Sequence, residues 1–228
     1  MEQGRYLKLV LTVIAVALSV IAISQIEVPP AKAGAAASLQ GDGWEMISQK
    51  VLTSDSSTIV FDNISSHYRF LWLVGTVQIA SPSSRVAVRL NGDAGSNYSR
   101  QITQFYGSSM ATQQYSDITS FDLEGPLGQM SAPNEGSRLI QVMIGNVDGD
   151  IKFLEGRVSV EIGSGGVTQV AHETTAGRWE GTAAVSEITL IDAANSSPGF
   201  RTGSRVMLFG APPTSMRFYR ADGEGEHF

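Results

Sequence analysis

The sequence contains no cysteine, which excludes disulfide bonds, thiol catalysis and thiolate-bound metals together. Lysine is scarce after residue 33, where only Lys50 and Lys152 occur. The net charge is −6 and no basic run is present, so we expect no nucleic-acid partner. The three histidines lie far apart and show no zinc-ligand spacing such as HExxH.

One long apolar segment lies near the N-terminus. Leu9–Ile26 contains no charged residue and follows Arg5 and Lys8. As a helix it would be about 27 Å long, close to the thickness of a bilayer core. The basic flank and the Ala31–Ala33 ending also fit a secretory signal. Residues 1–33 are therefore predicted to be a hydrophobic helical leader: a cleaved signal peptide, a membrane anchor, or a helix buried in an oligomer.

The composition changes after the leader. Residues 34–43 are small and polar and are predicted to form a flexible spacer. Charged residues make up 17% of the chain and glycine occurs 24 times, which is typical of a turn-rich globular domain and not of a disordered chain. We expect that domain over residues 44–210. Residues 211–228 begin with two prolines after Ala211 and are predicted to form a C-terminal tail.

Short β-type runs separated by turn-forming residues fill the domain. The clearest is Arg85–Leu90, where Val86, Val88 and Leu90 alternate with other residues as in a half-buried antiparallel strand. No helix-period stretch longer than two turns follows the leader, so the pattern predicts an all-β, antiparallel, jelly-roll-like sandwich. Gly75, inside the longest run, is predicted to mark a bend or bulge. The predicted strands are Ser57–Phe61, Tyr68–Ala80, Arg85–Leu90, Tyr98–Tyr106, Ile118–Leu123, Arg138–Ile144, Ile151–Phe153, Arg157–Ile162, Val167–Ala171, Val185–Ile191 and Arg205–Phe209.

Two gaps between strands are predicted to be exposed loops. Glu124–Ser137 contains two prolines and three glycines, and Asp192–Gly199 is also turn-rich. Binding residues concentrate on such loops. If the domain attaches to a surface, we expect these two loops to carry the attachment.

Two acidic segments have the composition of calcium loops. Asp148-Gly149-Asp150 places two carboxylates close together, but no bidentate glutamate follows it as in an EF-hand. Asn91–Asn97 has the same character. A turn with a positive φ angle explains both segments better, so no metal site is predicted.

No set of residues predicts catalysis. Gly107–Ala111 resembles a nucleophile elbow, which requires a helix after the serine, and the β pattern provides none. Two carboxylate pairs, Asp122/Glu124 and Glu173/Glu180, are of the kind a glycosidase uses, but solvated strand edges and loops explain them better. We expect no enzyme activity and no cofactor.

Three tryptophans offer the remaining candidate site. Trp44, Trp72 and Trp179 could stack on sugar rings if they are exposed. Core packing is favoured for all three, and most strongly for Trp72, which lies in an apolar strand.

The sequence from Trp44 to Gly210 resembles a known group of proteins. An N-G-D-x-x-x-x-Y turn follows a strand within VRLNGDAGSNY, and the domain closes with GRWEGTAAVSEITLI and FRTGSRVMLFG. Compact β-sandwich structural proteins encoded in tailed-phage genomes, often described as tail-fibre or virion-associated proteins, share this pattern. The matching positions are Asn91, Asp93, Tyr98, Trp179, Ile188, Phe200, Gly203, Ser204, Leu208 and Gly210.

This resemblance implies an architecture and a non-enzymatic role. The expected function is that of a phage virion structural or fibre-type protein, with assembly and host attachment as its tasks and no catalytic set. The resemblance implies a trimer and other virion proteins as partners. The alternative is an exported, envelope-anchored module that binds a cell-surface glycan and uses residues 9–26 at the membrane.

Overall fold

The computed structural model describes residues 43–81, 84–106, 109–125, 137–164, 167–194 and 198–213. These residues form β-strands and no α-helix, which confirms the predicted all-β class. The predicted leader, nearly all of the spacer and most of the tail lie outside them. Within the described ranges, no helix is long and apolar enough to span a bilayer.

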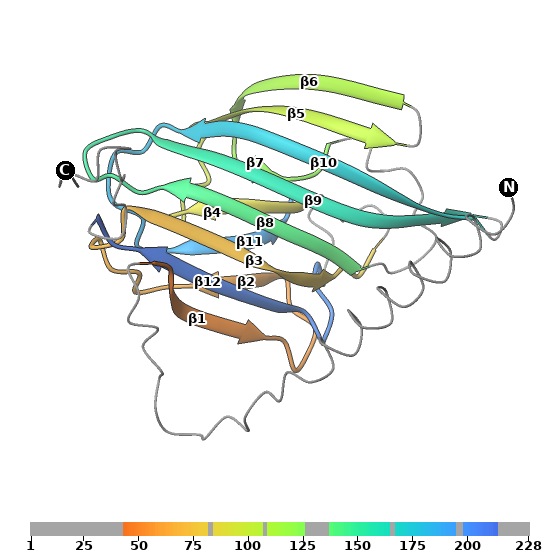
Figure 1. The fold of residues 1–228 in the computed structure, drawn as a ribbon, viewed down its shortest axis with the longest axis horizontal. Helices are drawn as coiled ribbons and strands as arrows, with labels where there is room; N and C mark the ends of the chain where they lie inside the picture. Colours follow the sequence, from red (N-terminus) through yellow and green to blue (C-terminus); the bar gives the residue numbers. More distant parts are fainter. Residues whose placement is uncertain are drawn as a thin grey trace, which may run out of the picture. The chain divides into compact units, whose positions relative to one another are not determined.

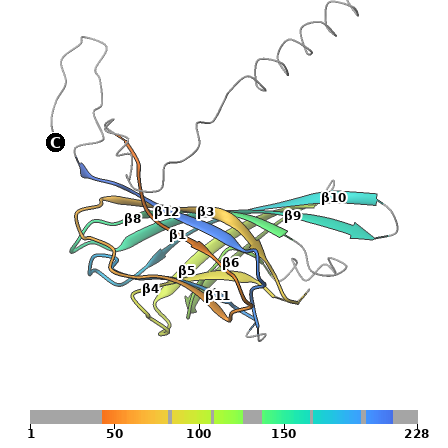
Figure 2. The same cartoon turned by 90° about the horizontal axis from the view of Figure 1, so that it is seen from below.

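The strands form two antiparallel sheets, one large and one small (Figure 1). The large sheet has the order β1 (Glu45–Val51), β12 (Arg205–Ala211), β3 (Phe70–Gln78), β8 (Ser137–Gly145), β9 (Lys152–Ser164), β10 (Val167–Trp179), β5 (Tyr98–Tyr106), β6 (Ser109–Ile118). The small sheet has the order β2 (Thr58–Phe61), β11 (Ile188–Asp192), β4 (Val86–Leu90), β7 (Phe121–Asp122). The small sheet lies on one face of the large one (Figure 2), giving a sandwich-like arrangement.

The core lies between the two sheets. Side chains of β3 alternate strictly, so that Leu71 and Leu73 are fully buried whereas Trp72 points to the opposite face. Val86, Val88 and Leu90 of β4 are fully buried from the other side, as predicted, but Ala87 between them is fully buried as well, so this strand is not half-buried. Each such buried valine or leucine side chain contributes about 1.5–3 kcal/mol of transfer free energy.

Gly75 does not mark a bulge, and that prediction is wrong. It pairs in unbroken register with Val206 of β12 and Ile140 of β8. A Cβ atom at this position would lie 2.2 Å from the backbone oxygen of Arg205. Glycine is therefore required because the neighbouring strand approaches closely, and not because the strand bends.

Several strands differ from those predicted. β1 and β6 were not predicted, and β10 continues through the polar residues as far as Trp179. The two segments predicted on either side of Gly156 form one strand, β9. At Gly156 the side chains of Phe121 and Leu123 occupy the space a Cβ atom would need, so this glycine serves packing and interrupts nothing.

Candidate functional site

The Asn91-Gly92-Asp93 segment forms the predicted turn. Asn91 and Gly92 have φ angles of 52° and 69°, and the N–H of Asp93 donates to the carbonyl oxygen of Leu90 at 3.0 Å. Positive φ at both central residues is characteristic of a type I′ turn. The turn hypothesis is thus confirmed for the first acidic segment.

The Asp93 carboxylate organises the residues around this turn. Its Oδ1 accepts from the N–H of Gly95 at 2.8 Å, and its Oδ2 accepts from Asn97 Nδ2 at 2.9 Å and Trp179 Nε1 at 2.6 Å. The hydrogen bond from Trp179 is the largest cause that lowers the pKa of Asp93. The Trp179 ring stacks on Tyr98, with ring centroids 6.4 Å apart. The residues of the N-G-D-x-x-x-x-Y pattern therefore hold the end of β10 against the turn after β4.

The second acidic segment is also a turn, and a lysine fills its centre. Gly149 has a φ of 83°, and Asp148 Oδ1 accepts from the N–H of Ala184 at 3.0 Å. The buried Lys152 ammonium donates to the carbonyl oxygens of Val147, Asp150 and Thr182 at 2.7, 2.5 and 2.8 Å. Burial lowers the pKa of Lys152, and the charges of Asp148 and Asp150 oppose that shift. The positive charge bound by the carbonyl oxygens of this loop is thus the Lys152 ammonium of the protein itself. Among the residues described, no three acidic or histidine side chains converge to hold a metal ion.

The closing pattern also has a structural role. Phe200 is buried and forms bridges to Ser56 and Ile79. The Ser204 hydroxyl donates to the carbonyl oxygen of Arg201 at 2.8 Å and accepts from the N–H of Gln78 at 2.9 Å. These contacts fasten the segment before β12 to the end of β3.

The structure brings together Glu124 and Glu173, one member of each predicted carboxylate pair. Glu124 Oε2 accepts from Arg138 Nε at 3.2 Å, and its Oε1 accepts from the N–H of Val86 at 3.1 Å. Glu173 accepts from Gln104 Nε2 at 2.8 Å and from the N–H of Gly125 at 2.7 Å. We call Glu124, Arg138, Glu173 and Gln104 the buried polar cluster.

The other two acids lie elsewhere. Glu180 is exposed and pairs with Arg178 at 3.1 Å. Asp122 pairs with Arg100 Nη2 at 3.1 Å, and the Arg100 guanidinium lies 4.6 Å from the centre of the Tyr115 ring. Arg100 also donates to the backbone oxygens of Asp122 and Glu124. It therefore ties β5 to β7 of the opposite sheet.

The buried polar cluster is closed to solvent. Glu124 and Arg138 are each 1% exposed and Glu173 is 3% exposed. Burial raises the pKa of both glutamates, opposed by the charge of Arg138 at Glu124 and by the Gln104 hydrogen bond at Glu173. The expectation that Glu124 is solvated at the start of an exposed loop is wrong, because β7 carries it between the sheets.

Among the remaining candidates, Ser109 and Asp192 lie within the described residues, and both have structural roles. Ser109 begins β6, so a strand and not a helix follows it. Asp192 is buried and accepts from the N–H groups of Arg85 and Ala194 at 2.8 and 2.9 Å. Most of the Glu124–Ser137 loop, residues 195–197 and Gly107–Ser108 lie outside the described residues.

The outer face of the large sheet, opposite the small sheet, is divided in polarity. One cross-strand row on this face runs from β1 to β6. Its members are Met46, Phe209, Trp72, Met143, Glu155, Ala176, Gln101 and Gln114. In this row the members from β1, β12, β3 and β8 are apolar, and those from β9, β10, β5 and β6 are mainly polar. We call these two sides of the face the apolar half and the polar half. The polar half also has exposed apolar side chains, at Phe105, Met110, Phe153 and Val170.

Aromatic rings are concentrated on the apolar half. The ring centroid of Trp72 lies 5.9 Å from that of Trp44 and 5.6 Å from that of Phe209. Core packing is confirmed for Trp179, which is buried, but it is wrong for Trp72, which lies half-exposed on the outer face. Hydrophobicity indicated a buried strand, and strand alternation placed this ring outside.

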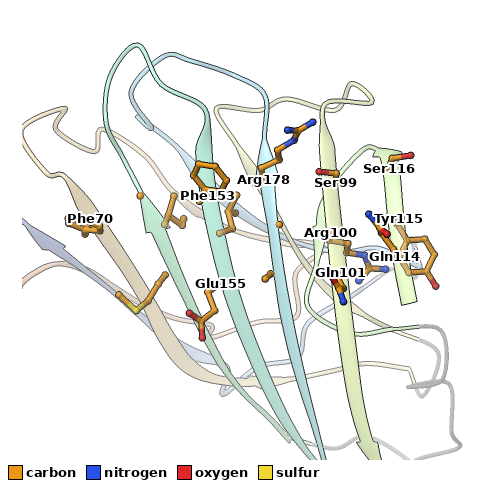
Figure 3. A pocket seen from close by; sticks show the side chains of 16 residues that line it. Phe70, Ser99, Arg100, Gln101, Gln114, Tyr115, Ser116, Phe153, Glu155 and Arg178 are labelled. Atoms are coloured by element: carbon orange, nitrogen blue, oxygen red, sulfur yellow. The ribbon is translucent and has the colours of Figure 1, made fainter. Parts of the chain in front are cut away.

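A groove of about 890 Å³ crosses one end of the outer face (Figure 3). Its lining includes Phe70 of β3, Phe153 of β9, and Gln101 and Gln114 of β5 and β6. Phe153 is 69% exposed. Sequence reasoning missed this groove, since its residues come from six strands and share no local pattern.

Comparisons with known proteins add nothing to this geometry. No family model matches the chain, and searches of curated proteins and of solved structures give no match either.

Proposed function

We propose that this protein is a non-enzymatic structural protein of the virion or fibre type, whose jelly-roll-like domain assembles with copies of itself. The observation that carries the proposal is the apolar half of the outer face. Met46 and Met143 are 58% and 43% exposed there, beside the Trp44, Trp72 and Phe209 rings. Contiguous apolar surface of this kind marks interaction sites in soluble domains.

The distribution of polar chemistry supports the same role. The acids and tryptophan singled out in the sequence hold turns and strands together: Asp93 binds Trp179, and Glu124 binds Arg138. The resemblance to phage structural proteins rests on these architectural positions and implies three-fold symmetry. The chain also passes repeatedly between the two sheets, as in a jelly roll.

The test is the oligomeric mass of the full-length chain in mild detergent. Met46→Gln with Met143→Gln should shift the protein towards monomer, since both side chains are exposed and contribute little to the core. The matched control is Glu155→Gln with Arg157→Gln, which removes an exposed ion pair from the polar half. An unchanged mass for the methionine variant would contradict the proposal.

A second candidate function is binding of a glycan in the groove. Phe153 presents an exposed ring with Glu155 and Arg178 beside it, and Gln101 and Gln114 of β5 and β6 add hydrogen-bond donors and acceptors across the groove. A flat ring together with polar side chains suits a sugar. Phe153→Ala should abolish retention on a glycan array, whereas Phe105→Ala, towards the other end of the same face, should not. Equal retention of both variants and the parent would exclude this groove.

A further inference from the structure

The sheets have four edges, and three of them are short or protected. β2 and β7 contain four and two residues. β1 has a register irregularity between Met46 and Ser48 and carries the charges of Glu45 and Lys50. Short length, bulges and charged side chains all prevent an edge from pairing with another chain.

The fourth edge, β6, has such protections only at its C-terminal end, where Asp117 carries a charge and lies in a register irregularity against β5. It contains ten residues, and Ser109–Ser116 includes no charged residue, proline or glycine. Its ladder with β5 is continuous from Ser109 to Tyr115. Its side chains are exposed or half-exposed throughout. No described strand lies beyond it, so one row of its backbone groups faces outward as a template for pairing.

We propose that β6 of one copy pairs antiparallel with β6 of a second copy, about a two-fold axis through Thr112 or Gln113. Directly opposed residues of an antiparallel pair share a face. An axis at Thr112 or Gln113 places that residue opposite the same residue of the second copy. The outer faces of both copies therefore lie on the same side, and the two large sheets join into one. The contact is self-complementary and closes after two copies.

Composition favours a second copy as the occupant. The uncharged Ser109–Ser116 segment brings no like charges opposite each other, and Thr and Gln side chains form favourable cross-strand pairs. The neighbouring strands belong to the polar half, with Gln101 beside Gln114 and Thr103 beside Thr112. The centre of the joined sheet would thus be mainly polar, with Met110 and Phe105 as its exposed apolar members.

The pairing would also extend the groove across the axis. Gln114 and Ser116 of β6 line the groove in one copy. With the axis at Thr112 or Gln113, Met110 or Thr112 of the partner subunit comes opposite Gln114. This inference goes beyond the proposed function, because it needs neither a virion nor a glycan.

The absence of native cysteine allows a direct test on the full-length chain in mild detergent. Antiparallel neighbours lie about 4.5–5.5 Å apart between Cα atoms, within the range that a disulfide spans. Under mild copper-phenanthroline oxidation, either Thr112→Cys or Gln113→Cys should form a covalent dimer at least about tenfold faster than Val60→Cys, an exposed control on β2 of the small sheet. A Gln113→Lys variant should lose the contact while its circular dichroism shows that it remains folded.

Three results would overturn the proposal. The first is cross-linking of neither β6 variant above the Val60→Cys control, as expected if another segment of the chain covers β6. The second is equal cross-linking of all three variants, which would indicate random collision. The third is an unchanged assembly mass for a folded Gln113→Lys protein. If the apolar half does not mediate self-association, the variant Met46→Gln with Met143→Gln will keep its assembly mass. The two proposals can therefore be tested separately.

Discussion

Trp179 Nε1 donates a 2.6 Å hydrogen bond to Asp93 Oδ2 across 86 positions of sequence. The bond fixes the last residue of β10 to the turn that follows β4, and it therefore joins the large sheet to the small one. Two residues from separate parts of the sequence pattern thus form a single structural unit.

Asp93→Ala should destabilise the domain more than Trp179→Phe. The first variant removes the acceptor of three hydrogen bonds and should cost about 2–3 kcal/mol. The second keeps a ring against Tyr98 and loses one bond, at about 1 kcal/mol. Urea denaturation of both single variants and the double variant measures the coupling. Strictly additive losses would show that the two residues act independently.

Glu124→Ala should be among the most damaging single changes. It leaves the Arg138 guanidinium buried without its carboxylate, which typically costs about 3–5 kcal/mol. Replacing the pair together, as Glu124→Leu with Arg138→Met, should recover most of that loss, because a buried ion pair is often no better than apolar packing. Thermal melts of the three variants test this. A double variant as unstable as Glu124→Ala would indicate that the cluster contributes through its wider hydrogen bonds.

Stability should fall as the pH rises above about 4.5 through the contribution of Glu173. Burial raises the pKa of this acid above its usual 4.5, so the folded state binds the proton more tightly than the unfolded state. Its contribution is therefore complete below pH 4.5 and is lost as the pH rises through the folded-state pKa. Glu173→Gln should flatten this slope in denaturation curves recorded from pH 4.5 to 8. Asp93 acts in the opposite sense below pH 3.8, where its lowered pKa means that stability is lost on further acidification.

Gly75→Ala should destabilise the domain by about 2 kcal/mol or more, because the new methyl group would meet the backbone of β12. Gly149→Ala is the matched control. Nothing lies within 4 Å of its Cβ position, and only its positive φ opposes the change, at about 1 kcal/mol. Similar melting temperatures for the two variants would contradict the close-approach explanation of Gly75.

The sequence was sufficient for the all-β class and for the main turn. The alternation of Val86, Val88 and Leu90 and the Asn91-Gly92 pair act locally, so they could be interpreted without a fold. β6 could not be predicted in the same way. Its serine, threonine and glutamine residues have no buried face, and its strand conformation depends on pairing with β5.

The candidate site was less accessible to sequence reasoning. Glu124 and Glu173 come from different predicted pairs, and only the sheet topology brings them to the same cluster. The groove likewise collects residues such as Phe70, Gln114 and Phe153 from distant strands. Trp72 showed the limit of hydrophobicity as a guide, because one face of its strand is core and the other is outer surface.

Light scattering of the full-length chain at micromolar concentration, in mild detergent, tests the central claim most directly. A self-assembling structural protein with three-fold symmetry should give the mass of three chains, or a multiple of three where β6 contacts persist. A monomer across the whole concentration range would contradict the account.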